Sequence, residues 1–316
     1  MMEHKVIMHG PAVRTFGVTP AALGAVLSRL GDSLHGAVDV AFRLSSRAGR
    51  RQPWLRRAGQ VELKDARKTG DHEMTMFFEA PAFGDVAADY YRQPPLFGPA
   101  PHREDTAFDV LGDAVSDVLS QRGDSDRFDV GLLKRFHGFQ SSVFKQEEVE
   151  ELLISGHRLP QPNPCRLSTE FAARAKKLYL QAPESARVRV AGRLDMIEAS
   201  TLAFALVLPG GERVRGVWKG DGFEILRALV NTDVVATGMA VYRPSGGLLR
   251  VDADVLAPQR DTDRFFAVVP TPTGGKMDLK SLLREQQSRG GLPAVWGKLA
   301  AEETDEEFLA AVAGME

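Results

Sequence analysis

Hydrophobic and polar positions alternate with a period of two in several short stretches of residues 187–258. In one stretch Phe204, Leu206 and Leu208 alternate with small residues, which predicts a strand with one buried face. Glycine-rich turns separate the stretches, and residues 222–230 have the spacing of an amphipathic helix instead. The resulting order of strand, hairpin, helix and hairpin predicts a small five-stranded barrel.

The same alternation places several arginines on the outside of this predicted barrel. They are Arg187, Arg189, Arg193, Arg213 and Arg215. A register slip of one residue would bury these charges, and an unpaired buried charge costs several kcal/mol. We therefore expect the arginines to point outward, away from Phe204, Leu206 and Leu208.

Residues 187–258 resemble an OB-type barrel in the order of their predicted elements and in the positions of their turns. The resemblance implies that oligonucleotides bind on the face of the second and third strands. On that face Ala203, Ala205 and Val207 accompany the arginines, and no aromatic ring is there to stack on a base. These small side chains equally suit packing against another domain or another chain.

The first 165 residues contain both helical and strand patterns. Thr19 and Pro20 predict a helix start, because a hydroxyl caps the helix and proline suits its first position. The further predicted elements are strands at 5–8, 38–44, 60–64 and 72–79, a loop at 45–59, and helices at 106–121, 126–138 and 168–180. Residues 143–155 fit either a helix or an edge strand.

A proline-rich stretch at 159–164 indicates a boundary between domains. We therefore predict an α+β protein in three parts. An N-terminal mixed domain covers residues 1–165, a helix and the OB-like barrel cover 166–260, and a linker with a short acidic C-terminal helix covers 261–316.

Composition predicts a cytoplasmic protein. The formal net charge of −2 gives no general attraction to nucleic acid or to a membrane surface. Cys165 is the single cysteine, so the chain cannot form a disulfide within itself. We find no apolar N-terminal segment and no apolar run near the ~20 residues that a membrane helix needs.

Catalytic signatures are absent from the sequence. It has no phosphate-binding glycine loop, no dinucleotide fingerprint, no nucleophile elbow and no paired-histidine metal motif. We therefore assign no catalytic residue, no metal ligand and no cofactor. A buried pair of ionisable residues in a cleft between the domains would favour an unrecognised enzyme.

A basic segment around Trp54 is the first candidate binding site. Between Ala41 and Gly70 there are nine basic and two acidic side chains. Those nearest the indole are Arg47, Arg50, Arg51, Arg56 and Arg57. Guanidinium groups beside an exposed ring suit single-stranded nucleic acid, through phosphate contacts and base stacking. In the alternative interpretation, Trp54 packs onto its own domain and the segment is only solvated.

The C-terminal segment is the second candidate. Thr304 can cap a helix with three acidic residues in its first turn and an apolar stripe. The predicted partner-binding residues are Trp296, Phe308, Leu309 and Val312. The segment resembles acidic tails of bacterial antitoxin-type partners of nuclease toxins, although it lacks their Trp-Pro-Gly-Asp core.

These patterns favour a non-enzymatic binding protein. In the first hypothesis it binds nucleic acid through the basic segment and through Arg189, Arg193, Arg213 and Arg215. In the alternative it is a protein-interaction module, antitoxin-like or an accessory subunit of a bacterial complex, that uses its acidic tail.

Overall fold

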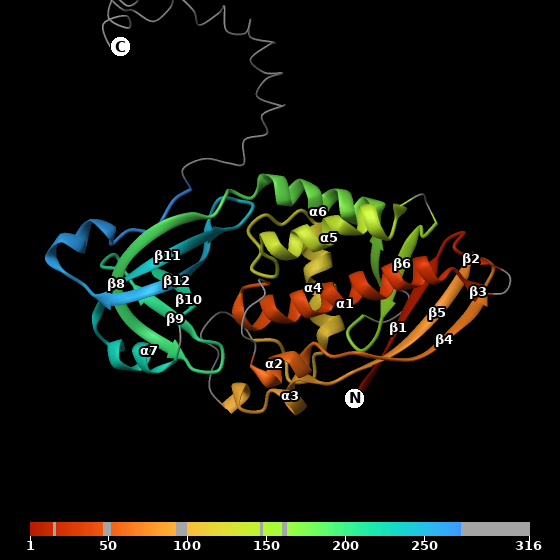
Figure 1. Ribbon diagram of the computed structural model, residues 1–316, viewed down its shortest axis with the longest axis horizontal. Helices are drawn as coiled ribbons and strands as arrows, with labels where there is room; N and C mark the ends of the chain where they lie inside the picture. The colour runs from red at the N-terminus through yellow and green to blue at the C-terminus, as the bar shows by residue number, and fades with distance from the viewer. Residues whose placement is uncertain are drawn as a thin grey trace, which may run out of the picture. The chain divides into compact units, whose positions relative to one another are not determined.

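The computed structural model describes residues 1–14, 17–46, 52–92, 100–145, 148–159, 163–220 and 222–272. These residues belong to one compact unit, Met1–Gly275. The unit contains two hydrophobic cores, one between a sheet and several helices and one inside a barrel (Figure 1). Mixed α and β structure is thereby confirmed, whereas the predicted C-terminal helix lies outside the described residues.

The first core is built on an antiparallel five-stranded sheet. Its strands are β1 (Met2–His9), β4 (Glu62–Gly70), β5 (Glu73–Ala80), β6 (Glu151–Ser155) and β7 (Cys165–Ser168), in the order β4-β5-β1-β6-β7. Alternate residues such as Val6, Met76 and Leu152 are buried, as the period of two requires. A separate small hairpin is formed by β2 (Val13–Arg14) and β3 (Gly17–Val18).

Four long helices lie against one face of this sheet (Figure 1). They are α1 (Pro20–Arg43), α4 (Ala107–Leu119), α5 (Val130–Ser142) and α6 (Thr169–Gln181). The predicted start of α1 is confirmed, since the Thr19 hydroxyl accepts a hydrogen bond from Ala22 N. Shorter helices are α2 (Pro53–Ala58), α3 (Phe83–Val86) and the 3-10 turn η1 (Tyr90–Arg92).

Two local predictions in this region are wrong. Residues 38–44 do not form a strand, because α1 continues to Arg43. The helix is buried on nearly every side from Gly36 to Val40, where Asp39 is also buried. The large apolar residues Val38, Val40 and Phe42 then fall at every second position by chance and resemble a strand pattern. The predicted loop at 45–59 contains α2, and the ambiguous segment at 143–155 ends in strand β6.

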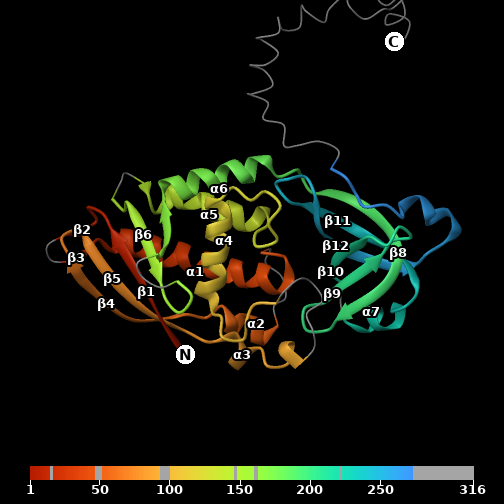
Figure 2. The ribbon, with the colours of Figure 1, turned by 180° about the vertical axis from the view of Figure 1, so that it is seen from behind.

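The second core lies inside a closed barrel, as predicted. Its elements are β8 (Ala186–Glu198), β9 (Ala203–Val207), β10 (Arg213–Trp218), α7 (Glu224–Leu229), β11 (Asp233–Tyr242) and β12 (Leu248–Pro258). The strands close in the order β10-β12-β11-β8-β9, with β10 and β12 parallel, which is consistent with an OB-like barrel (Figure 2). Phe204, Leu206 and Leu208 lie in its core, so the predicted register is confirmed. Gly216 lies opposite Phe204, where a Cβ would approach the ring within 2.1 Å.

The barrel is joined to the helices by buried polar contacts. Arg250 of β12 donates to the carbonyl of Leu44 at the end of α1 and to Ser45 Oγ. Ala203 and Ala205 point out of the barrel yet are buried, so other parts of the chain cover them. Packing thus occupies part of the face on which an OB-type barrel would bind oligonucleotides.

After the barrel, the chain forms the 3-10 segment η3 (Asp261–Phe266). The predicted domain boundary after residue 165 stays a prediction. In the structure β7 and α6 belong to the first core through Leu167 and Phe171. Among the described residues, no helix has both the length and the apolar character to cross a membrane.

Candidate ligand cleft beside helix α4

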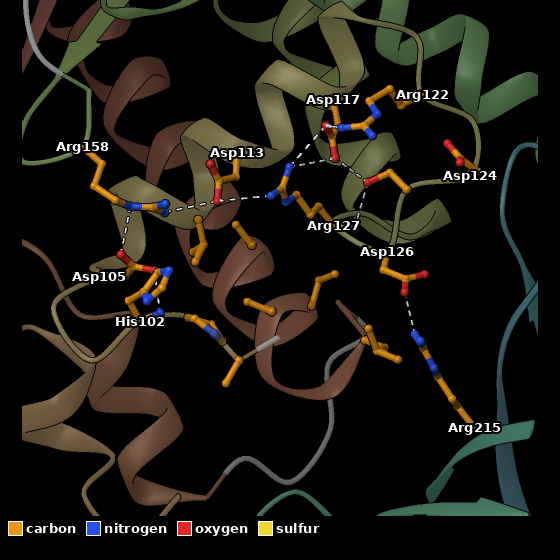
Figure 3. Close-up of a pocket in the computed structure, with 18 residues that line it drawn as sticks. His102, Asp105, Asp113, Asp117, Arg122, Asp124, Asp126, Arg127, Arg158 and Arg215 are labelled. Atoms are coloured by element: carbon orange, nitrogen blue, oxygen red, sulfur yellow. Dashed lines mark hydrogen bonds and ion pairs between the residues drawn. The ribbon is translucent and has the colours of Figure 1, made fainter. Parts of the chain in front are cut away.

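Helix α4 carries an aspartate at every fourth position. Asp109, Asp113 and Asp117 share one face of the helix, and Asp105 lies one turn before them. Asp109 belongs to the capping of α4, because its carboxylate accepts hydrogen bonds from Thr106 N and Thr106 Oγ1, both at 2.9 Å. The other three line a cavity (Figure 3).

Arginines from two other segments pair with these carboxylates. Arg158 spans two of them, with Nε 2.8 Å from Asp105 Oδ1 and Nη2 3.1 Å from Asp113 Oδ2. Arg127 Nη1 lies 3.3 Å from both oxygens of Asp117. Figure 3 shows the resulting row of alternating negative and positive side chains along α4.

Asp117 holds a second arginine and a hydroxyl. Arg122 Nη1 lies 3.2 Å from its Oδ1, and Ser125 Oγ donates to its Oδ2 at 2.7 Å. The Asp117 side chain is only 6% exposed, whereas those of Arg122 and Arg127 are 59% and 50% exposed. One buried carboxylate therefore orients two guanidinium groups that remain open to solvent.

These side chains face a cavity of about 420 Å³, which we call the α4 cleft. The opposite wall is apolar and comes from the C-terminal half of α1. It is formed by Ala37, Val40, Ala41 and Leu44. The cleft therefore offers charged groups on one side and an apolar surface on the other, the combination that fixes a small ligand in one orientation.

Asp126 links the edge of the cleft to the barrel. Arg215 Nη1 lies 2.6 Å from its Oδ2, and Arg243 Nε lies 2.8 Å from its Oδ1. Burial alone would raise the pKa of the Asp126 carboxyl, but the hydrogen bonds from the two arginines outweigh burial and lower it. At the other end of the cleft, burial raises the pKa of the Asp105 carboxyl, and Arg158 opposes this only in part.

The cleft has unused capacity to bind an anion. A guanidinium carries five N–H donors, and among the described residues Arg122 has a partner only at Nη1. A carboxylate or phosphate accepts two parallel hydrogen bonds from such a group. Within the described parts of the chain, no cluster of histidine, cysteine and carboxylate side chains could hold a metal ion.

The basic segment around Trp54 lies partly outside the described residues, which exclude Arg47, Arg50 and Arg51. Trp54 packs edge-on against Phe42 at 5.2 Å and tilted against Tyr90 at 5.8 Å, between ring centroids. Its indole therefore contacts its own domain, as the alternative interpretation expected. Arg56 and Arg57 are exposed on α2.

The predicted barrel arginines are not brought together into one basic patch of unpaired charges. Arg189 pairs with Asp263 at 2.8 Å, Arg213 with Asp195 at 3.5 Å, and Arg215 with Asp126. Arg193 is exposed on β8, opposite Asp233 in the strand register. Nucleic-acid binding by these residues stays a prediction.

The predicted partner-binding residues Trp296, Phe308, Leu309 and Val312 lie outside the described residues. The use of the acidic tail therefore also stays a prediction. No family, relative or known structure supports its resemblance to antitoxin tails.

Sequence reasoning missed the α4 cleft, although one signal for it is present. Aspartates at 105, 109, 113 and 117 repeat with a period of four, so they mark one face of a helix. The arginines that pair with them come from 122, 127 and 158, and only the fold brings these together.

Comparison with protein families, with curated proteins and with solved structures gives no match for this chain.

Proposed function

We propose that this protein is a binding protein that holds a small anionic ligand in the α4 cleft. The observation that carries the proposal is the pair Arg122 and Arg127, both oriented by Asp117 at one end of a 420 Å³ cavity. Groups fixed before binding lose little conformational entropy when a ligand arrives, which favours affinity.

The charge balance along the cleft supports an anion at this end. Arg158 bridges Asp113 and Asp105 and offsets one of their two negative charges, whereas Arg215 and Arg243 together carry two positive charges against the one of Asp126. At this end the single buried carboxylate of Asp117 is shared by Arg122 and Arg127, so two positive charges lie beside one negative charge. Arg127 Nη2 also lies 3.9 Å from Asp113 Oδ2. Asp124 also lines the cleft, but it is exposed and therefore well screened by water.

The ligand class follows from the two walls. A carboxylate or phosphate group would lie on Arg122 and Arg127, and the uncharged part of the molecule would lie on the apolar wall of α1. A cavity of about 420 Å³ suits a small organic molecule. A nucleotide phosphate has the required chemistry, so the cleft and the predicted nucleic-acid binding are not exclusive.

Calorimetric titration tests the proposal with four probes: inorganic phosphate, citrate, adenosine monophosphate and a single-stranded oligonucleotide. At about 50 mM salt, where phosphate contacts are strong, we expect saturable binding of at least one probe. Arg122→Ala should weaken it about tenfold, as expected for one charge-assisted hydrogen bond. The matched control is Arg264→Ala, which removes an arginine that is 78% exposed and lies outside the cleft.

The four probes also separate the hypotheses. Binding of the small anions that depends on Arg122 supports the cleft. Binding of the oligonucleotide alone, with loss in a variant that replaces Arg56 and Arg57 by alanine, supports the predicted nucleic-acid surface and contradicts the cleft. If none of the four probes binds, the result contradicts both the anion-binding cleft and the nucleic-acid surface.

A further inference from the structure

A second groove lies on the outer surface of the barrel, beneath η3. It encloses about 550 Å³. Its floor is largely apolar and comes from β11 and β12, through Val235, Thr237, Val255 and Ala257. All the barrel strands are paired on both sides, so the groove can take a chain across the sheet but cannot add a strand to an edge.

The wall of the groove is fixed by its own contacts. Asp263 accepts hydrogen bonds from Arg189 Nη2 at 2.8 Å and from the backbone N–H of Arg260 at 2.9 Å. The Arg189 guanidinium also lies 4.4 Å from the centre of the Phe266 ring. Contacts within the chain therefore hold η3 in place along the groove, and a wall that is already ordered lowers the entropic cost of binding.

The charge of the groove favours a carboxylate ligand. Asp263 is neutralised by Arg189. Arg260 lines the groove and is exposed, and its guanidinium has no ion pair with any of the described residues. Two ion pairs lie nearby, Arg187 with Asp254 and Arg264 with Asp261. Asp233, whose carbonyl accepts a hydrogen bond from the N–H of Gln259 in the groove, lies opposite Arg193 in the strand register.

Large apolar side chains are exposed at and near this surface. Val255 is 48% exposed on the floor of the groove, and Phe265 in η3 is 86% exposed. An exposed phenyl ring beside an apolar groove is typical of a contact surface for another protein, because burial of such side chains drives association.

We infer that the groove beneath η3 binds an acidic peptide segment of a partner protein. An apolar side chain of the peptide lies on Val255 and Val235, and an adjacent carboxylate pairs with Arg260. This site is independent of the α4 cleft, so either site can exist without the other.

Fluorescence anisotropy with short labelled peptides tests the inference on the full chain. The probe has the sequence Gly-Glu-Leu-Glu-Phe-Gly, and its matched control has glutamine in place of both glutamates. We expect the acidic probe to bind at least about tenfold more tightly than its control, as for one charge-assisted pair.

Three variants locate the binding. Arg260→Ala should weaken it about tenfold, and Val255→Asp should abolish it by placing a negative charge on the apolar floor. Arg264→Ala should leave it within about twofold, because Arg264 pairs with Asp261 outside the groove. Thermal melting must first show that each variant is folded.

Three results would overturn the inference. One is no saturable binding of the acidic probe up to about 1 mM, the limit of weak affinity. Another is equal binding of the glutamine control. The third is equal binding by wild type and Arg260→Ala.

Discussion

Arg250 Nη1 of β12 lies 3.4 Å from Asp129 Oδ2 at the start of α5, and both side chains are almost completely buried. Asp129 also accepts hydrogen bonds from Ser46 N and Leu132 N, each at 2.9 Å. The Arg250 guanidinium reaches Leu44, which ends α1 in the left-handed conformation with φ 52°. This pair therefore connects the barrel to the ends of two helices.

Replacement of Arg250 by alanine should be among the most destabilising single changes in this chain. Asp129 and Asp252 would lose a buried partner, and breaking a buried pair typically costs about 3–5 kcal/mol. Urea denaturation measures the change in the free energy of unfolding. Arg264→Ala is the surface control and should change it by less than about 0.5 kcal/mol. Similar losses in the two variants would show that the buried pair does not hold the barrel in place.

The barrel register gives a second prediction. Leu206→Ala should cost about 2–5 kcal/mol, because it leaves a cavity among fully buried side chains. Arg215→Ala should cost about 0.5–1 kcal/mol, since Arg243 still pairs with Asp126. Thermal melts of the two variants compare them directly. A larger loss in Arg215→Ala would mean that the ion pair at Asp126 contributes more than the barrel core.

His4 makes stability depend on pH. Burial lowers the pKa of the His4 imidazole from 6.5, the value in the unfolded chain, to about 4. The nearby negative charge of Asp109 raises this pKa and so opposes the effect of burial in part. The folded protein therefore binds fewer protons than the unfolded chain between these values. The contribution of neutral His4 to the free energy of unfolding is fully present above pH 6.5. It is lost as the pH falls toward 4, and the total loss is roughly 3 kcal/mol.

Denaturation curves between pH 7.5 and 4 test this contribution in wild type and in His4→Gln. The glutamine can replace the hydrogen bond between His4 Nε2 and Thr106 Oγ1, which is 3.0 Å long. The variant should lose less stability on acidification than wild type. Parallel pH dependence in the two proteins would exclude His4 as the source.

Cys165 should be unreactive in the folded protein. The pKa of its thiol is raised to about 12, mainly because the side chain is buried. At pH 8 the thiolate fraction is then roughly a thousandfold below that of an exposed cysteine, and the thiolate is the reactive form. A colorimetric thiol reagent should label the chain rapidly only in denaturant. Rapid labelling of the native protein would show that β7 opens readily.

Local patterns predict this fold where neighbouring residues decide the structure. The barrel strands have a clean alternation and glycine-rich turns, so the inward position of Leu206 follows from sequence. The sequence predicts a strand near Val38 where helix α1 continues, because the helix is surrounded by protein there and burial on nearly every side removes the helical period. Periodicity reports burial on one face and cannot identify an element that has no exposed face.

The candidate site depends on contacts between distant residues, which is why most of it could not be predicted. The row of aspartates on α4 is visible in the sequence, but Arg158 is 45 residues from its partner Asp113. The alternation in the sequence predicts that the barrel arginines face outward, as they do, but the carboxylate that pairs with Arg215 belongs to Asp126, 89 residues earlier. A surface of free arginines and a surface of ion pairs have the same local pattern.

The most direct test of the anion-binding cleft is an NMR titration of arginine side-chain Nε–H signals with inorganic phosphate. Signals of Arg122 and Arg127 are assigned by single Arg→Lys variants, with Arg264 as the reference outside the cleft. We predict saturable shifts of the Arg122 and Arg127 signals with one common dissociation constant, while the Arg264 signal stays in place. Unchanged Arg122 and Arg127 signals, or equal shifts at all three arginines, would contradict a specific anion site in the α4 cleft.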